Sequence, residues 1–228
     1  MTVDMQRFEM FRQGVEMLPQ MAQPTDMPAA ERLAKVKTTF RAKLNANMAV
    51  ELESCVHCGQ CAEACHFYNA TQDPKYTPIR KLDLLKRFYR REVSPLRWIH
   101  QLYTRDITIQ ELEEWQELVY DSCTECGRCF MVCPMGINIA SMVNVNRQAL
   151  ANAGMIPPEL RAMEQEQYNG PTLFNMGPEQ AEGAIAQMSE QLGIDIPLNK
   201  DKAEVMLLTS VVEVMIFNDQ LIGGIKVL

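Results

Sequence analysis

The chain has 228 residues, a formal net charge of −7 and 47% hydrophobic residues. This length allows one or two modest domains with a real core, and the acidic balance argues against a nucleic-acid-binding protein, which would be basic. No apolar stretch reaches the roughly 18–20 residues of a membrane-spanning helix, and the N-terminus lacks the apolar region of a signal peptide, so we expect a cytoplasmic protein with reduced cysteines rather than disulfides.

The chain opens with a methionine-rich segment, residues 1–28. It could form an amphipathic helix that docks on a partner, because methionine suits adaptable contact surfaces, or it could be a frayed tail. A further helix is expected over residues 29–46, where apolar side chains recur at helical spacing. We interpret residues 1–50 together as an N-terminal helical docking extension.

The most informative feature is an internal repeat that holds all eight cysteines. The first copy is CVHCGQCAEACH (residues 55–66) and the second is CTECGRCFMVCP (residues 123–134). Both follow the pattern C-x-x-C-G-x-C-x-x-x-C, which is typical of cubane iron–sulfur clusters held by four thiolates. Structural zinc sites usually use two separated cysteine pairs, and disulfides do not suit the expected compartment, so both alternatives are less favoured.

We predict two [4Fe–4S] clusters whose ligands cross between the motifs. Three closely spaced cysteines wrap three corners of one cubane. The fourth, which we expect to have entered a helix, points away and reaches the other cluster, as in two-cluster ferredoxins. The predicted ligand sets are Cys55, Cys58 and Cys61 with Cys133, and Cys123, Cys126 and Cys129 with Cys65.

Other residues of the motifs are predicted to support the clusters. Gly59 and Gly127 would let the backbone approach each cluster, and Pro134 would set the direction in which the chain leaves it. His66 takes the place of this proline in the first motif. We favour a packed aromatic role for His66, although it could bond a cluster sulfide and couple a proton to reduction. His57 is expected to face solvent.

Two helices are predicted between the motifs. One covers residues 78–93, and the other covers residues 108–121 and opens with Thr108 and Glu111 in the register of a capping box. Ferredoxins of the βαβ type join their motifs far more tightly than this. We therefore predict a mainly α protein with an all-helical two-cluster ferredoxin domain over residues 51–157.

The C-terminal third is predicted to change character. After a helix within residues 137–155, residues 158–200 are interpreted as a connector with a helix that begins at Pro178. The apolar segment 202–210 is predicted to be a buried strand. Because a lone strand cannot pair its backbone groups, residues 201–228 are interpreted as the start of an incomplete α/β domain, completed by further polypeptide or by a partner.

The segments CVHCGQCAEACHFYNATQDPKYTPIRKLDLLKRFYRR and DSCTECGRCFMVCPMGINIA resemble the iron–sulfur part of heterodisulfide reductase-like proteins. This family includes a small C-type subunit, a fused D-type subunit and related components of redox complexes in sulfur metabolism. Iron–sulfur subunits of glycolate oxidase and anaerobic glycerol-3-phosphate dehydrogenase are more distant relatives. In the fused members, a cysteine-rich domain with CCG motifs performs disulfide chemistry. No CCG occurs here, so we expect no catalytic residue in this chain.

The resemblance implies an electron-transfer protein that relays electrons to or from such a CCG-type domain or subunit. It also implies a membrane-bound or flavin-containing redox subunit as a further partner, with the protein cytoplasmic or peripheral on the cytoplasmic membrane face. Two alternatives stay open. The chain could be the electron-wire part of a longer glycolate oxidase-type or glycerol-3-phosphate dehydrogenase-type subunit, or a scaffold whose clusters only hold the fold.

Two sets of basic residues bear on this function. Arg128, inside the second motif, is expected to favour the reduced cluster. Lys86, Arg87, Arg90 and Arg91 are interpreted as the solvated face of a helix, with docking to an acidic partner or an anionic membrane as the alternative.

Overall fold

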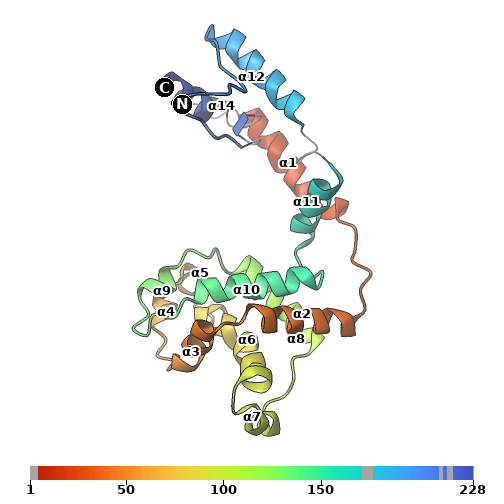
Figure 1. Ribbon diagram of the computed structural model, residues 1–228, viewed down its shortest axis with the longest axis vertical. Helices are drawn as coiled ribbons and strands as arrows, with labels where there is room; N and C mark the ends of the chain where they lie inside the picture. The colour runs from red at the N-terminus through yellow and green to blue at the C-terminus, as the bar shows by residue number, and fades with distance from the viewer. Residues whose placement is uncertain (1–4, 171–176, 211–212, 215–217, 228) are drawn as a thin grey trace. The chain divides into compact units, whose positions relative to one another are not determined.

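The computed structural model describes residues 5–170, 177–210, 213–214 and 218–227, and within these ranges it is helical without any strand (Figure 1). The prediction of a mainly α fold is therefore confirmed. The chain divides into two compact units: Pro24–Pro157 forms one, and Met1–Gln23 with Pro158–Leu228 forms the other. No helix of the described residues is long and apolar enough to cross a membrane.

The unit Pro24–Pro157 contains both cysteine motifs and many short helical elements. Those labelled η1 and η2 are 3₁₀-helical, and those labelled η3 and η4 are π-helical. In chain order the elements are α2 (Ala29–Lys43), α3 (Ala46–Ser54), α4 (Gln60–Glu63), α5 (His66–Thr71), η1 (Pro74–Tyr76), η2 (Pro78–Leu82), α6 (Asp83–Phe88), η3 (Tyr89–Val93), α7 (Arg97–Tyr103), α8 (Ile109–Gln116), η4 (Glu117–Asp121), α9 (Arg128–Met131) and α10 (Ile139–Asn152).

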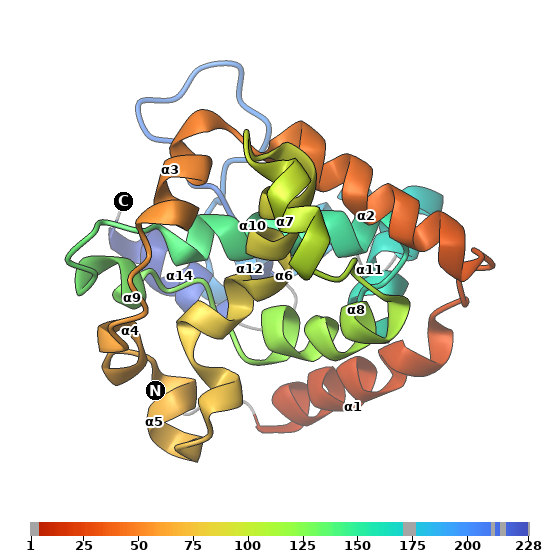
Figure 2. The ribbon, with the colours of Figure 1, turned by 90° about the horizontal axis from the view of Figure 1, so that it is seen from below.

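Helix α10 forms the centre of this unit. It runs alongside α2 and also packs against η2, η4, α8 and α9 (Figure 2). Its buried residues Met142, Val143, Ala149 and Leu150 recur at helical spacing and are at most 1% exposed. Burying each large apolar side chain stabilises the fold by roughly 1.5–3 kcal/mol, so α10 is the main stabilising element around which the cysteine motifs are arranged.

The predicted helix over residues 108–121 is confirmed, including its capping box. The Thr108 hydroxyl accepts a hydrogen bond from the Glu111 backbone N–H at 3.3 Å, and the Glu111 carboxylate accepts one from the Thr108 N–H at 3.0 Å. Each end of the box thus satisfies a backbone donor that the first helical turn leaves unpaired. The helix starts as α8 and ends as the π-helical η4.

The predicted helix over residues 78–93 is helical throughout but is not one α-helix. It is 3₁₀-helical in η2, α-helical in α6 and π-helical in η3. Leu82, Leu85 and Phe88 are all at most 1% exposed, as their spacing predicted. However, a 3₁₀-helix has three residues per turn instead of 3.6, so the side chains of η2 point in other directions than those of a continuous α-helix would. Lys81 in η2 is buried as well.

The other unit consists of four helices within its described residues. These are α1 (Met5–Met21), α11 (Pro158–Asn169), α12 (Pro178–Leu192) and α14 (Asn218–Val227). Helix α1 packs on α11, so Met5–Met21 of the methionine-rich segment is helical, whereas residues 22–28 are irregular. Docking of this segment on a partner stays a hypothesis. A small apolar cluster is formed by Val214, by Met188 of α12 and by Leu221 of α14.

The predicted strand over residues 202–210 is wrong. These residues are irregular, and Val205, Met206 and Leu208 are 60%, 75% and 80% exposed. A strand is stabilised by hydrogen bonds to a neighbouring strand, and the described part of the chain offers none. Residues 211–212 and 215–217, which belong to the same prediction, lie outside the described residues.

Gly154, after α10, provides a test of close packing in the unit Pro24–Pro157. Its φ is +65°, and a Cβ atom added there would lie 2.7 Å from Cγ2 of Thr25. We expect Gly154→Ala to lower the free energy of unfolding by more than the roughly 1–2 kcal/mol that a left-handed backbone costs other residues. Urea denaturation followed by circular dichroism would measure this loss.

Gly136→Ala is the matched control, because Gly136 has a φ of +63° and open space around its Cβ position. Gly136→Ala should lower the free energy of unfolding by no more than the roughly 1–2 kcal/mol that the left-handed backbone costs. Equal losses for the two variants would show that Thr25 does not restrict this position.

Candidate metal centres

The two cysteine motifs adopt the same loop conformation. In each, the residue before the second cysteine has positive φ, +54° at His57 and +53° at Glu125. The glycine after the second cysteine also has positive φ, +83° at Gly59 and +73° at Gly127. A Cβ on either glycine would meet nothing within 4 Å, so these positions favour glycine because of their left-handed backbone.

The fourth cysteine of each motif lies outside a helix, contrary to the prediction. The helices α4 and α9 are each a single turn and contain the third cysteines, Cys61 and Cys129. The Cys65 N–H bonds to the Ala62 carbonyl at 3.0 Å, and the Cys133 N–H bonds to the Phe130 carbonyl at 3.2 Å. These i→i+3 bonds close the turns, because the last carbonyls of a helix lack partners within it.

The motifs meet at one end of α10, where α4 and α9 are in contact (Figure 2). Two cavities lie there, with similar empty volumes of about 400 and 380 Å³. Each is lined by three cysteines of one motif and the fourth cysteine of the other. The first cavity is lined by Cys55, Cys58, Cys61 and Cys133, and the second by Cys65, Cys123, Cys126 and Cys129.

Burial and backbone contacts shape the chemistry of these thiols. Burial raises the pKa of Cys61 and Cys123, and it raises the pKa of Cys129 to about 11. The backbone N–H of Glu125 donates to Cys123 Sγ at 3.4 Å. Without metal these thiols would thus stay protonated at neutral pH, whereas a bound metal deprotonates its coordinating thiol.

The donor set of each cavity suits an iron–sulfur cluster. Four cysteines are the usual ligands of a [4Fe–4S] cluster, and soft thiolates favour such clusters, zinc or copper. Among the described residues, no three His, Cys, Asp or Glu side chains gather closely enough to hold one metal ion. Thiolates around a four-iron core are spaced more widely than those around one ion, because the core lies between them.

A common wall separates the two cavities. It is formed by η2 and the start of α10: Ile79 lines the first cavity, Lys81 lines the second, and Ile139 lines both. Ile139 is only 3% exposed. The cavities are therefore adjacent, with apolar side chains between them.

Lys81 is a site residue that no sequence pattern singles out. It is 1% exposed, and its Nζ donates to the Tyr76 carbonyl at 3.1 Å. Burial lowers the pKa of Lys81, and nearby thiolates oppose this effect; they belong to Cys65, Cys123, Cys129 and Cys61. In the sequence, Lys81 is one of many basic residues in a helical segment, and only the 3₁₀ turn directs it inward.

The other predicted site residues lie at the cavity margins. Pro134 and the exposed His57 line the first cavity. His66 lines the second cavity, not that of its own first three cysteines, and its ring packs on Phe67 with centroids 4.4 Å apart. Arg128 also lines the second cavity but is exposed.

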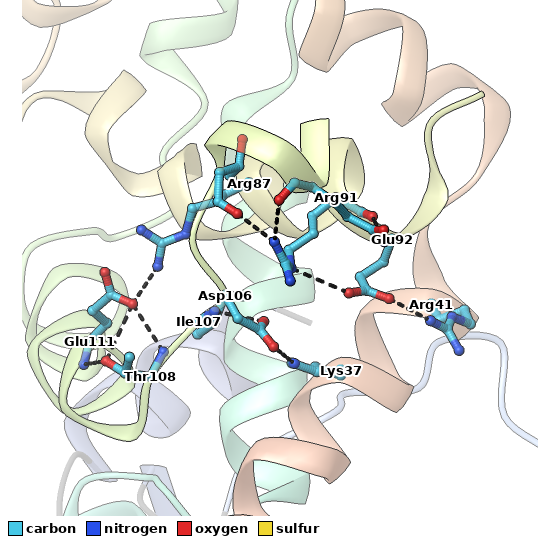
Figure 3. Close-up of polar contacts among 11 residues, drawn as sticks. Lys37, Arg41, Arg87, Arg91, Glu92, Asp106, Ile107, Thr108 and Glu111 are labelled. Atoms are coloured by element: carbon cyan, nitrogen blue, oxygen red, sulfur yellow. Dashed lines mark hydrogen bonds and ion pairs between the residues drawn. The ribbon is translucent and has the colours of Figure 1, made fainter. Parts of the chain in front are cut away.

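The basic stretch Lys86, Arg87, Arg90 and Arg91 is only partly solvated: Lys86 is buried, and the three arginines are partly buried. Figure 3 shows Arg87 directed toward Glu111 and Arg91 beside Glu92. Lys86 is only 8% exposed. The solvated-face interpretation is therefore wrong for Lys86, because the switch from α-helix to π-helix packs this segment against neighbouring helices; docking to a partner stays a hypothesis.

The comparisons with known proteins agree with this donor chemistry. A family model described as a 4Fe-4S dicluster domain matches residues 51–137. The Hdr-like menaquinol oxidoreductase iron-sulfur subunit 2 of Archaeoglobus fulgidus is 29% identical over 170 residues, which cover 71% of this chain and 30% of that protein.

Two further relatives match over shorter lengths. The D-type subunit of the dihydromethanophenazine:CoB–CoM heterodisulfide reductase of Methanosarcina acetivorans is 34% identical, covering 58% of this chain and 32% of the relative. The EtfAB:quinone oxidoreductase of Syntrophomonas wolfei is 28% identical, covering 48% of this chain and 18% of the relative.

The chain thus spans about a third or less of the curated relatives that it matches, for example 30% and 32% of two of them. No solved structure shows a significant match to it. The dicluster domain and these relatives together agree with the resemblance seen in the sequence. The chain is thus similar to heterodisulfide reductase-like iron–sulfur subunits, and its residues 51–137 match the 4Fe-4S dicluster domain.

Proposed function

We propose that this chain carries two [4Fe–4S] clusters and passes electrons between them within a heterodisulfide reductase-like complex. The observation that carries the proposal is the crossed grouping of the cysteines: each cavity collects three from one motif and one from the other. This grouping is the ligand arrangement of two-cluster ferredoxins. The proposed ligand sets are Cys55, Cys58, Cys61 and Cys133 for the first cluster, and Cys123, Cys126, Cys129 and Cys65 for the second.

The residues of this chain would hold the clusters, separate them and exclude water. A bound [4Fe–4S] cluster supplies one-electron redox chemistry, with a potential set by nearby charge, hydrogen bonds to sulfur and burial. The N–H of Glu125 provides such a hydrogen bond at Cys123. Ile137 and Ile139 are each 3% exposed and line the first cavity, so they keep it apolar.

We further propose that the catalytic chemistry belongs to a cysteine-rich, CCG-type domain or subunit. The name of the heterodisulfide reductase relative supports a partner with disulfide chemistry, and the names of two other relatives support a quinone-linked partner. A membrane-bound or flavin-containing subunit as partner, and a location in the cytoplasm or at its membrane face, are part of the same proposal. Residues 201–228, with the exposed run at Val205–Leu208, would then contact further polypeptide.

Purified without oxygen, the protein should be brown and contain about eight irons, because two clusters of four irons each are expected. Iron and sulfide analysis with a visible absorption spectrum measures this. A colourless protein with stoichiometric zinc would contradict the proposal, since zinc also binds cysteine sets.

Both clusters should also accept electrons reversibly. An electron-transfer role requires a reduction potential within the range of roughly −700 to +450 mV known for such clusters. A titration followed by electron paramagnetic resonance should give two one-electron steps. Clusters that resist reduction by dithionite would instead favour the scaffold alternative.

The crossed ligation can be tested by comparing four cysteine variants. Cys58→Ser and Cys126→Ser change exposed ligands in the middle of the first and second motif, so their spectra define the loss of each cluster. Cys65→Ser should then resemble Cys126→Ser, although Cys65 belongs to the first motif. Cys133→Ser should resemble Cys58→Ser. The measurement is the paramagnetic resonance spectrum of each reduced variant.

The alternative, in which each motif binds its own cluster, predicts different spectra. If Cys65→Ser gives the spectrum of Cys58→Ser, each motif binds its own cluster and the crossed assignment is wrong. The two reference variants themselves show which signal belongs to which cluster, so the spectra need no independent assignment.

A further inference from the structure

The buried lysine that lines the second cavity has no acidic partner among the described residues. Lys81 is 1% exposed, and no carboxylate of the described residues lies within 4 Å of its Nζ. Its one hydrogen bond goes to the carbonyl of Tyr76, and its ammonium lies 5.9 Å from the centre of the Phe67 ring. An isolated buried charge is strongly unfavourable, so the protein must balance this charge in another way.

The position of Lys81 is fixed from the backbone side. Its carbonyl accepts a hydrogen bond from the side-chain amide of Asn146 at 2.9 Å. Asn146 belongs to α10 and is fully buried, and Lys81 belongs to η2, which packs on α10. The backbone of Lys81 is therefore held against α10, the central helix of the unit.

Once bound iron deprotonates them, cysteine sulfurs would provide the negative charge that balances Lys81. The thiolates that act most strongly on it belong to Cys65, Cys123 and Cys129 of the second cavity, followed by Cys61 of the first. Lys81 itself lines only the second cavity. Its charge thus acts on both centres, and more strongly on the second.

We propose that Lys81 raises the reduction potential of the second cluster above that of the first; this inference depends on the proposed function. Reduction adds one electron and no proton to a cluster that already carries negative charge. A cation fixed close by, in an interior where charges are poorly screened, stabilises the more negative state. Electrons that enter at the first cluster would therefore tend to move to the second.

Other cations near the cavities do not provide the same asymmetry. Among the described residues that line the first cavity there is no lysine or arginine. Arg128 lines the second cavity but is exposed, so water and salt screen its charge. Arg147 lies close to Cys123, but its charge is balanced by Glu125 at 3.1 Å. Lys86 is also buried, and its Nζ lies 3.5 Å from Nε2 of His57, which lines the first cavity, but Lys86 itself lines neither of the two cavities. Among the described residues, Lys81 is the buried lysine that lines one of them.

The test is a redox titration of the whole chain with its clusters, followed by paramagnetic resonance. Lys81→Met removes the charge, Lys81→Gln removes it but keeps a donor for the Tyr76 carbonyl, and Lys81→Arg keeps it. We expect the variants Lys81→Met and Lys81→Gln each to shift the reduction equilibrium of the second cluster about tenfold toward the oxidised form. This shift lowers its reduction potential by ~59 mV, because the step transfers one electron. The first cluster should shift less.

The controls separate charge from packing. Lys81→Arg should restore most of the potential, and Arg128→Met, which removes an exposed cation at the same cavity, should shift it less than Lys81→Met. If Lys81→Met does not fold, the potential of the second cluster in Lys81→Gln tests the inference instead. An unchanged second cluster, an equal shift of both clusters, or an Arg variant that shifts as far as the Met variant would overturn the inference.

The proposed function is checked first and separately, by the iron content of the unchanged protein. If that protein lacks two reducible clusters, the proposed function fails and the inference fails with it. If the unchanged protein has both clusters and the Lys81 variants leave their potentials alone, only the inference about Lys81 is wrong.

Discussion

The structure depends on bringing two cysteine motifs, far apart in the sequence, to the same end of α10. Each cavity lacks its fourth cysteine until α4 and α9 come into contact. The chain between the motifs achieves this with α6 and α8, whose apolar faces pack in one core with α10. Leu85 of α6 and Val119 of η4, which continues α8, are both fully buried. The hydrophobic core therefore has a functional consequence, because it sets where the second motif returns.

Two polar side chains, Lys81 and Asn146, are buried in this core, and removing them from water costs free energy. Lys81 lies in η2 and Asn146 in α10. Lys81 donates a hydrogen bond to the carbonyl of Tyr76, and the Asn146 amide donates one to the carbonyl of Lys81. Buried polar groups are tolerated when they are paired in this way. The polar contacts farther from the cavities are more exposed, such as the pair of Lys37 and Asp106 at 2.5 Å (Figure 3). Such surface pairs contribute little stability, so the two kinds of polar contact have different roles.

The proposed electron-transfer role concerns one of the two units of the chain. The unit Pro24–Pro157 holds the cysteine sets, whereas the second unit contains an exposed apolar run. Its relatives are considerably longer, since the matched segments cover only 32% of one and 18% of another. We therefore propose that the acceptor or donor of these electrons lies in further polypeptide or in a partner subunit.

The sequence by itself determined the cluster type, the two four-cysteine sets that the structure gathers, the helical class and the Thr108 capping box, because each depends on spacing along a short stretch of chain. Ligand binding by those sets stays a prediction. Only the tertiary structure decided that the predicted strand does not form, that Cys65 lies outside a helix and that Lys81 is buried. These features depend on neighbours from distant segments: a strand needs a partner strand, and a lysine turns inward only where a 3₁₀ turn, a buried asparagine and a group of thiolates meet.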